Sequence, residues 1–213
     1  MARCIAQLVS IALMTAIAVG CSTAPSRFYS LASTSTADGT PPTTAAVMVG
    51  PVTIPAAVDQ PEFVVQVAPN RVEVNEFNRW VSPLGDSIAR AVAGDLVVLL
   101  GSPEVANSQL ANFVPDYRVT IDVQRFESIQ GQAAVVEAVW TVRKTAGGEI
   151  RSGRTVAREA VQGQGFEALA AAHSQAIAKM SGDIAAAIRA ESEQNGSATM
   201  GSDFSKAKGK VIL

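Results

Sequence analysis

Apolar and polar residues alternate most regularly over residues 117–124, where every second side chain is apolar. This alternation is typical of a strand with one buried side and one solvent-facing side. It returns after a turn at Gly131, in residues 136–142, and a third strand is expected near residues 155–161. The three segments together predict an antiparallel meander.

Two longer segments repeat apolar residues at helical spacing instead. In residues 84–100 one side is almost entirely apolar, with Ser82 as the expected N-cap and Gly101 as the stop. Residues 166–190 are rich in alanine and carry a second apolar stripe. We expect both helices to pack against the sheet through these stripes.

The N-terminal half contains further segments that are apolar and β-branched enough for strands. These segments are residues 27–31, residues 47–54 and the two strands of a predicted hairpin, residues 63–67 and 71–75. Gly50-Pro51 predicts a bulge or bend, and Asn70 suits the hairpin turn because asparagine tolerates a left-handed conformation. Residues 33–45, rich in Ser, Thr and Pro, predict a flexible loop.

These elements predict a single compact α/β domain of the α+β type over residues 21–190. Its sheet is expected to be mixed or mainly antiparallel, with the two main helices packed on it. Residues 191–213 are polar, contain Gly and Ser, and carry three lysines. We expect this tail to be disordered, because so little apolar surface cannot offset the entropy lost on ordering it.

The first twenty residues have the pattern of a bacterial lipoprotein signal peptide. Arg3 precedes a mostly apolar run, Ile5–Val19, which is shorter than the roughly twenty apolar residues that span a bilayer. Gly20 supplies the small residue before the cut, and Cys21 supplies the thiol that receives the lipid. We expect Cys21 to become the acylated first residue of the mature protein. The alternative is an ordinary cleaved signal followed by an accidental cysteine.

Composition narrows the classes of function. Cys4 leaves with the signal and Cys21 is expected to carry lipid, so no disulfide is expected. Removal of the signal also removes Arg3, which leaves 16 of the 17 basic residues against 19 acidic ones. This balance gives nucleic acid no basic surface to bind.

Residues able to carry catalysis are few. His173 is the single histidine of the chain and lies on the apolar stripe of the second helix. We expect it to be a packing residue, the alternative being a catalytic base. The sequence contains no nucleophile elbow, phosphate-binding loop or dinucleotide fingerprint, and histidine and cysteine cannot assemble a metal site. We therefore expect no enzyme activity, no metal and no cofactor.

Several short motifs in a fixed order resemble a known family, the PqiC family of ABC-type transport auxiliary lipoproteins. The motifs lie at residues 49–55, 59–61, 70–72, 76–80, 83–84, 116–118, 122–126 and 140. The resemblance covers roughly residues 21–190. The chain departs from the family at Ala57-Val58, where the family often has an aromatic residue and a leucine, and at Gln60, where it has arginine.

The resemblance implies an outer-membrane lipoprotein that faces the periplasm and acts as a transport accessory. The implied partners are an MCE-domain protein that crosses the periplasm and an inner-membrane transport component. The implied process is intermembrane lipid transport, which supports envelope integrity. Family members assemble into rings, so a homo-oligomer is compatible with this reading. The alternatives are a structural envelope lipoprotein unrelated to transport, such as a cell-wall tether, and a periplasmic lipid hydrolase.

Candidate partner-binding residues cluster around a proline-bracketed segment, residues 54–72, whose loops should be exposed between strands. The candidates are Asp59, Pro61, Asn70, Arg79 and Trp80. The alternative for the segment is that its prolines merely end strands. For Trp80 we favour packing at the start of the first helix over a role as an exposed partner anchor.

Overall fold

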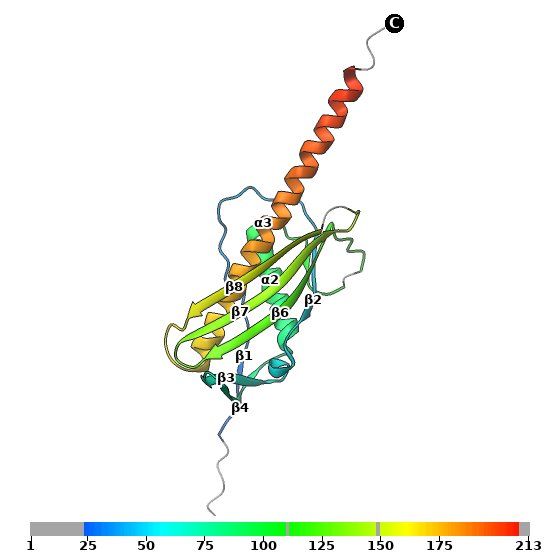
Figure 1. Cartoon of the computed structure of the whole chain (residues 1–213). Helices are drawn as coiled ribbons and strands as arrows, with labels where there is room; N and C mark the ends of the chain where they lie inside the picture. The colour runs from blue at the N-terminus through cyan, green and yellow to red at the C-terminus, as the bar shows by residue number, and fades with distance from the viewer. Residues whose placement is uncertain (1–23, 110, 148–149, 209–213) are drawn as a thin grey trace, which may run out of the picture.

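The structure, a computed structural model, describes residues 24–109, 111–147 and 150–208, with side chains described up to residue 192. The predicted signal peptide and Cys21 therefore lie outside the described residues. Within these ranges the chain forms an eight-stranded sheet and two long helices (Figure 1). The elements in chain order are β1 Arg27–Tyr29, β2 Val47–Thr53, the 3-10 helix η1 Ala56–Val58, β3 Glu62–Ala68, β4 Arg71–Trp80, α2 Leu84–Leu100, β5 Val105–Ala106, β6 Tyr117–Ile129, β7 Ala133–Lys144, β8 Ile150–Ala160 and α3 Gly165–Lys208.

The C-terminal half of the sheet is the predicted antiparallel meander β6–β7–β8. Tyr117 pairs with Lys144 at one end of the β6–β7 ladder, and Ile129 pairs with Ala133 at the other. All three strands are longer than the alternating pattern indicated, and α3 lies along β7 and β8 on the face that the meander buries (Figure 1).

The N-terminal half adds parallel pairs to the other edge of β6, which confirms a mixed sheet. Strand β2 pairs in parallel with the start of β6, and β3 pairs in parallel with its end. Strand β4 forms the predicted antiparallel hairpin with β3 and accepts the short β1 in parallel on its outer edge. The register of β2 shifts between Val49 and Val52, which confirms the bend predicted at Gly50-Pro51.

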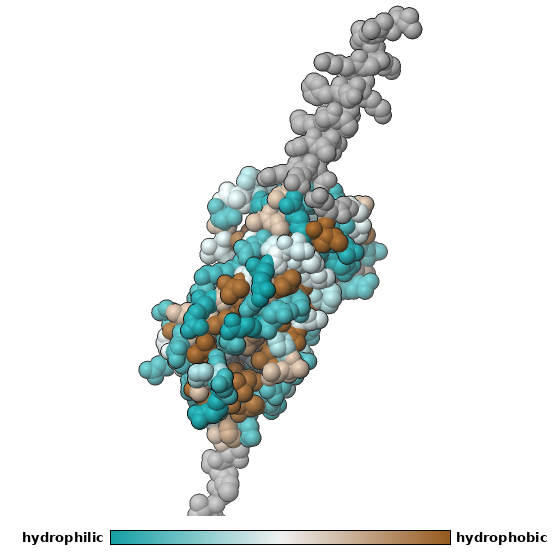
Figure 2. Space-filling model, in the orientation of Figure 1, coloured by the Kyte–Doolittle hydropathy of each residue, from teal (hydrophilic) through white to brown (hydrophobic). Residues whose placement is uncertain are grey.

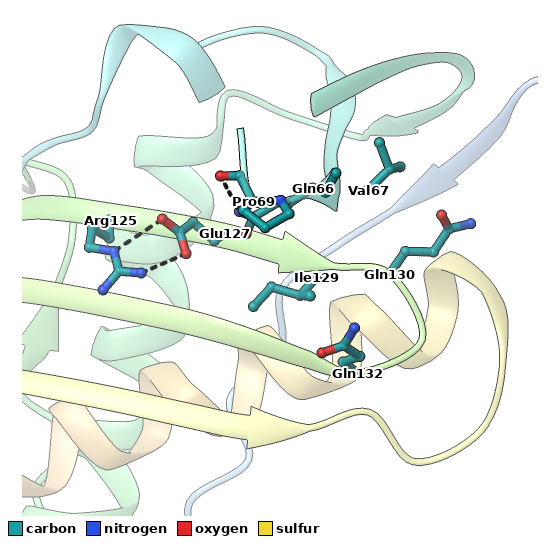
Figure 3. A pocket seen from close by; sticks show the side chains of 9 residues that line it. Gln66, Val67, Pro69, Arg125, Glu127, Ile129, Gln130 and Gln132 are labelled. Carbon is teal, nitrogen blue, oxygen red and sulfur yellow. Dashed lines mark hydrogen bonds and ion pairs between the residues drawn. The ribbon is translucent and has the colours of Figure 1, made fainter. Parts of the chain in front are cut away.

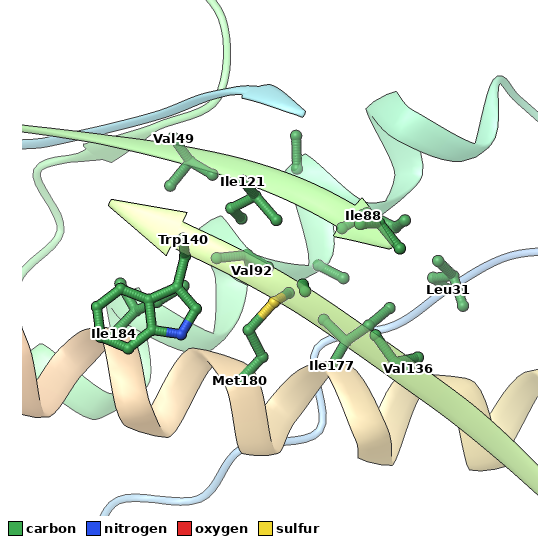
Figure 4. Packing of buried hydrophobic residues seen from close by; sticks show 14 of the residues in the cluster. Leu31, Val49, Ile88, Val92, Ile121, Val136, Trp140, Ile177, Met180 and Ile184 are labelled. Carbon is green, nitrogen blue, oxygen red and sulfur yellow. The ribbon is translucent and has the colours of Figure 1, made fainter. Parts of the chain in front are cut away.

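The core lies between the meander and the two helices. Figure 4 shows Ile177 and Met180 of α3 and Val92 of α2 close to sheet residues such as Val136 and Ile121. These five side chains are at most 2% exposed. Burying large aliphatic side chains stabilises a fold by about 1.5–3 kcal/mol each, so this layer provides most of the stability of a domain with no expected disulfide.

The predicted extent of α2 is confirmed, but the predicted cap at its start is wrong. Gly101 has a φ of 62° and ends the helix in a left-handed conformation, as expected. The N-cap position is occupied by Pro83, and no side chain caps the helix. The Ser82 hydroxyl instead lies 2.8 Å from the Ser87 hydroxyl, so the expected capping role of Ser82 is wrong.

Helix α3 does not end near Ala190 but continues to Lys208, through most of the segment expected to be disordered. Contacts between the helix and the sheet continue directly after the predicted end at Ala190. Glu191 is 6% exposed and forms an ion pair with Arg151 of β8 at 2.7 Å, and the Ser192 hydroxyl lies 3.1 Å from the Tyr117 hydroxyl. These contacts hold the helix to the sheet as far as residue 192, and its last turns project away from the sheet (Figure 1).

Residues 30–46, the N-terminal strap, contain no regular secondary structure but are not a free loop. Asp95 of α2 is fully buried, and its Oδ1 accepts hydrogen bonds from the Ser33 hydroxyl at 2.8 Å and from the Thr34 and Ser35 amides at 2.9 Å. Arg189 of α3 donates to the Pro41 carbonyl at 2.6 Å. The expectation of a flexible loop is therefore wrong, because the buried Asp95 and the half-buried Arg189 hold the strap onto both helices.

The structure leaves no room for a side chain at Gly153 of β8. A Cβ built at this position would lie 2.1 Å from Cζ2 of Trp140, whose ring covers it. Gly153→Ala should lower the free energy of unfolding by about 3 kcal/mol, at the upper end for an overpacked core. Gly182→Ala in α3 is the matched control, since no atom beyond its chain neighbours and its own stretch of helix backbone lies within 4 Å of its Cβ position. It should stabilise the protein by up to about 1 kcal/mol, and equal urea midpoints for the two variants would contradict this account.

Candidate partner-binding surface

The outer face of the β3–β4 hairpin carries a hollow of about 380 Å³, which lies under η1 and beside β6. We call it the hairpin hollow. Its apolar wall comes from three segments, and the residues that form it are Pro55, Val58, Val64, Val72 and Val74. Its remaining lining includes Asn70, Gln124 and Arg125, which are exposed.

Strand register explains why the valines gather there. Val64 pairs with Val74 and Gln66 pairs with Val72, and paired residues of a ladder share one face of the sheet. The alternate residues Phe63 and Val65 face the core and are at most 4% exposed. Val72 and Val74 remain 60% and 49% exposed. An apolar floor with a polar rim is the usual composition of a protein-binding site.

A second, more polar cavity of about 620 Å³ adjoins the hollow at the hairpin turn (Figure 3). It shares Gln66, Pro69, Arg125 and Glu127 with the hollow. Arg125 donates from Nη2 and Nε to the two carboxylate oxygens of Glu127, at 2.7 and 3.1 Å. This bidentate pair fixes the guanidinium at the boundary between the two depressions.

Among the predicted partner-binding residues, the structure brings only some together. Asp59 and Pro61 are exposed beside η1, and Asn70 is exposed at the hairpin turn and lines the hollow. Arg79 lies at the far end of β4 and forms an ion pair with Glu62 at 2.8 Å. Of these candidates only Asn70 lines the hollow, whereas Arg79 lies beside the other end of the segment, against Glu62.

Trp80 belongs to the core rather than to any exposed surface. It is 5% exposed, its ring stacks on Phe63 with centroids 4.1 Å apart, and it meets the Phe126 ring edge-on at 6.0 Å. The packing reading of Trp80 is thus the right one, and its place among the partner-binding candidates is wrong, because the rings of Phe63, Phe126 and His173 surround it.

His173 is also a packing residue, as expected. Its ring is fully buried, stacks on Phe126 with centroids 3.9 Å apart, and places Nε2 at 2.8 Å from the Ser128 hydroxyl. Ser128 is 2% exposed, so both side chains of the pair are buried. Burial lowers the pKa of His173 to about 3, which keeps the ring neutral at every physiological pH.

The depressed pKa of His173 predicts a pH-dependent stability. The unfolded chain takes up a proton near pH 6.5 and the folded chain does not, so stability falls as the pH drops below 6.5. The free energy of unfolding should be about 2 kcal/mol lower at pH 5 than at pH 7. Because the chain has one histidine, the urea midpoint of His173→Gln should depend less on pH between pH 5 and pH 7 than that of the wild type. An equal pH dependence in both proteins would show that His173 is not its cause.

Sequence reasoning missed the valines of the hollow and the buried Asp95. A signal existed for Asp95, since it lies three residues after Val92 and seven after Ile88 on the apolar stripe of α2. A carboxylate at such a position must find donors. For Val72 and Val74 the strand pattern alone did not show which side of the hairpin would stay uncovered.

The part of the chain that the structure describes contains neither a candidate metal site nor a candidate membrane-spanning helix. No group of three or more His, Cys, Asp or Glu side chains there is placed to hold a metal ion. Among the described helices, none is both long and apolar enough to cross a membrane.

Comparison with known proteins shows which family this chain belongs to. One similar crystal structure is that of protein XCC0632 from Xanthomonas campestris, of family DUF330. The match covers 80% of the present chain and 99% of XCC0632, with 21% sequence identity and a TM-score of 0.65. The chain covers 99% of a second crystallised, uncharacterised protein with 78% of its length, 20% identity and a TM-score of 0.63. Both likenesses show a shared fold. No curated protein matches the chain. The model of the ABC-type transport auxiliary lipoprotein component matches residues 29–185, so the chain belongs to this family, as its resemblance to the PqiC-type sequences indicated.

Proposed function

We propose that this protein is an accessory subunit of an MCE-type intermembrane lipid transport system. It is anchored through Cys21 in the outer membrane, faces the periplasm, and supports envelope integrity. Its partners are a periplasm-spanning MCE-domain protein and an inner-membrane transport component. The observation that carries the proposal is the family match over residues 29–185, which starts eight residues after the cysteine of a lipoprotein signal.

The hairpin hollow is the surface that we assign to the MCE-domain partner. Val72 and Val74 have solvent-exposed apolar surface that a bound partner would bury, and pairing with β3 holds their strand in place. Exposed residues mounted on strands lose little entropy when a partner binds. A non-catalytic role agrees with the burial of the Ser128–His173 pair and with the family description.

The anchor is tested by mass spectrometry of the mature N-terminus and by sucrose-gradient fractionation of the envelope. The wild-type protein should carry diacylglycerol and palmitate on Cys21 and sediment with the outer membrane. Ser22 follows the cysteine, where lipoproteins retained at the inner membrane often carry aspartate. Cys21→Ser should remain unprocessed or mislocalised. A wild-type protein found wholly in the inner-membrane fraction contradicts the sorting proposal.

Asp59→Arg should weaken the complex with the MCE-domain protein without changing thermal stability. Asp59 is exposed at the end of η1 beside the hollow, and charge reversal at the rim of an interface mainly disturbs association. Glu104→Arg is the control, because Glu104 is exposed beside the opposite end of β2. Co-purification of the detergent-extracted complex and a thermal melt are the measurements.

Full recovery of the partner with Asp59→Arg, together with an unchanged melt, would remove the hollow from the interface. The outer face of β6 at Arg118 and Thr120, which lies outside the hollow, would then be the next surface to test.

A further inference from the structure

The edge of the sheet nearest the N-terminus exposes large apolar side chains. Phe28 of β1 is 62% exposed, Phe77 of β4 is 39% exposed, and Val81, directly after β4, is 59% exposed. Soluble domains seldom leave two phenylalanines and a valine uncovered at one edge, and such a patch marks an interaction surface. We call these three residues the anchor-proximal patch.

The pairing of β1 with β4 puts these side chains on the outer side of the sheet. Tyr29 pairs with Trp80, and both turn inward, with the Tyr29 ring 5.6 Å from the buried Phe63 ring. Phe28 pairs with Arg79 and therefore faces outward. The Val81 amide donates to the Tyr29 carbonyl at 2.9 Å, so the ladder continues and Val81 follows Arg79 onto the same outer side.

The length of the tether limits how far this patch can lie from the membrane. Only residues 22–26 separate the expected lipid anchor at Cys21 from β1. Five extended residues reach at most about 18 Å. Figure 1 shows the N-terminal segment leaving beside β1 and β4, whereas the end of α3 projects from the opposite end of the molecule. Figure 2 shows hydrophobic side chains at the end where the N-terminal segment leaves.

We propose that the anchor-proximal patch rests on the phospholipid surface that holds the acylated Cys21. Phe28, Phe77 and Val81 enter the boundary between headgroups and acyl chains, where aromatic and aliphatic side chains of interfacial proteins insert. The half-buried Arg79, the register partner of Phe28, lies on the same outer side and is held there by its ion pair with Glu62. The patch thus fixes an orientation in which α3 points away from the membrane. This inference rests on the proposed lipidation of Cys21.

Site-directed spin labelling of the full-length lipidated protein tests the orientation. Cys4 leaves with the signal and Cys21 is acylated, so an introduced cysteine provides the one free thiol of the mature chain. Phe28→Cys and Val81→Cys place labels in the patch. Ile150→Cys is the control, because Ile150 is 51% exposed and lies at the far end of the meander, paired with Arg143.

In vesicles of phosphatidylethanolamine and phosphatidylglycerol, the labels at positions 28 and 81 should gain accessibility to oxygen and lose accessibility to a water-soluble nickel complex. The label at position 150 should behave as a label in water. Patch labels that match the control would overturn the proposal. Patch labels shielded from both reagents would also overturn it, because protein, either a second copy or a partner, would then cover the patch.

Mass spectrometry of the same samples distinguishes failure of the proposed lipid anchor from failure of the proposed orientation. A protein without lipid on Cys21 refutes the proposed anchor and, with it, the proposed function. A lipidated protein whose patch labels lie in water refutes the orientation alone. A thermal melt equal to that of the wild type verifies that each labelled variant is folded, as expected for replacements of exposed side chains.

Discussion

Trp80→Ala should lower the free energy of unfolding by about 4 kcal/mol, in the range observed when a large buried aromatic side chain is deleted. The Trp80 ring is 5% exposed and stacked on Phe63, and it also meets the rings of Phe126 and His173 edge-on, the latter at 6.3 Å. Removing it opens a cavity where β4, β6 and α3 meet. Urea denaturation of the soluble domain measures the loss.

Trp80→Phe is the matched variant, since it keeps an aromatic ring against Phe63 and should lose much less stability. Both variants should still recover the proposed MCE-domain partner at temperatures where they are folded. An unchanged urea midpoint for Trp80→Ala, combined with lost partner binding, would contradict the packing role and return Trp80 to the interface.

Asp95→Ala should destabilise the protein by about 3 kcal/mol and release the N-terminal strap. The Asp95 carboxylate accepts three hydrogen bonds from the strap through Oδ1 and one from the Ser181 hydroxyl, at 2.9 Å, through Oδ2. Alanine leaves these donors in or near the core without an acceptor, and an unsatisfied buried polar group costs about 1–3 kcal/mol. Urea denaturation and hydrogen exchange of the Thr34 and Ser35 amides measure the two effects.

Asp95→Asn keeps the size of the side chain and its hydrogen bonds and removes only the charge. Its side-chain carbonyl can still accept the strap bonds, and its amide can donate to the Ser181 hydroxyl, which in turn donates to the Ile177 carbonyl at 3.0 Å. The asparagine variant should therefore lose clearly less stability than the alanine variant. Equal losses, or unchanged exchange at Thr34 and Ser35 in Asp95→Ala, would show that the strap is held by other contacts.

The parts of the fold that the sequence predicted are those set by neighbouring residues. Alternation in residues 117–124 identifies β6, because a half-exposed strand imposes a period of two. Gly101 identifies the end of α2 through its left-handed conformation. The hairpin β3–β4 follows from two apolar runs that flank Asn70.

The parts that escaped prediction depend on contacts between distant residues. Nothing in residues 27–29 shows that they pair in parallel with residues 78–80, and the Ser- and Thr-rich strap reads as a loop until the carboxylate of Asp95 is placed beneath it. The same holds for α3, whose extension past Ala190 relies on Arg151 and Tyr117 from the sheet. The segment of the candidate site was predicted, but its apolar floor was not, because exposure of Val72 depends on which elements leave it uncovered.

The central claim is that this lipoprotein works with an MCE-domain transport partner, and purification from envelopes tests it most directly. The full-length wild-type protein is extracted in mild detergent, purified under native conditions, and its associated proteins are identified by mass spectrometry, with Cys21→Ser processed in parallel. We expect recovery of an MCE-domain protein together with an inner-membrane transport component, and loss of both with Cys21→Ser. Recovery of peptidoglycan fragments with no MCE-domain protein would contradict it and favour a structural envelope lipoprotein.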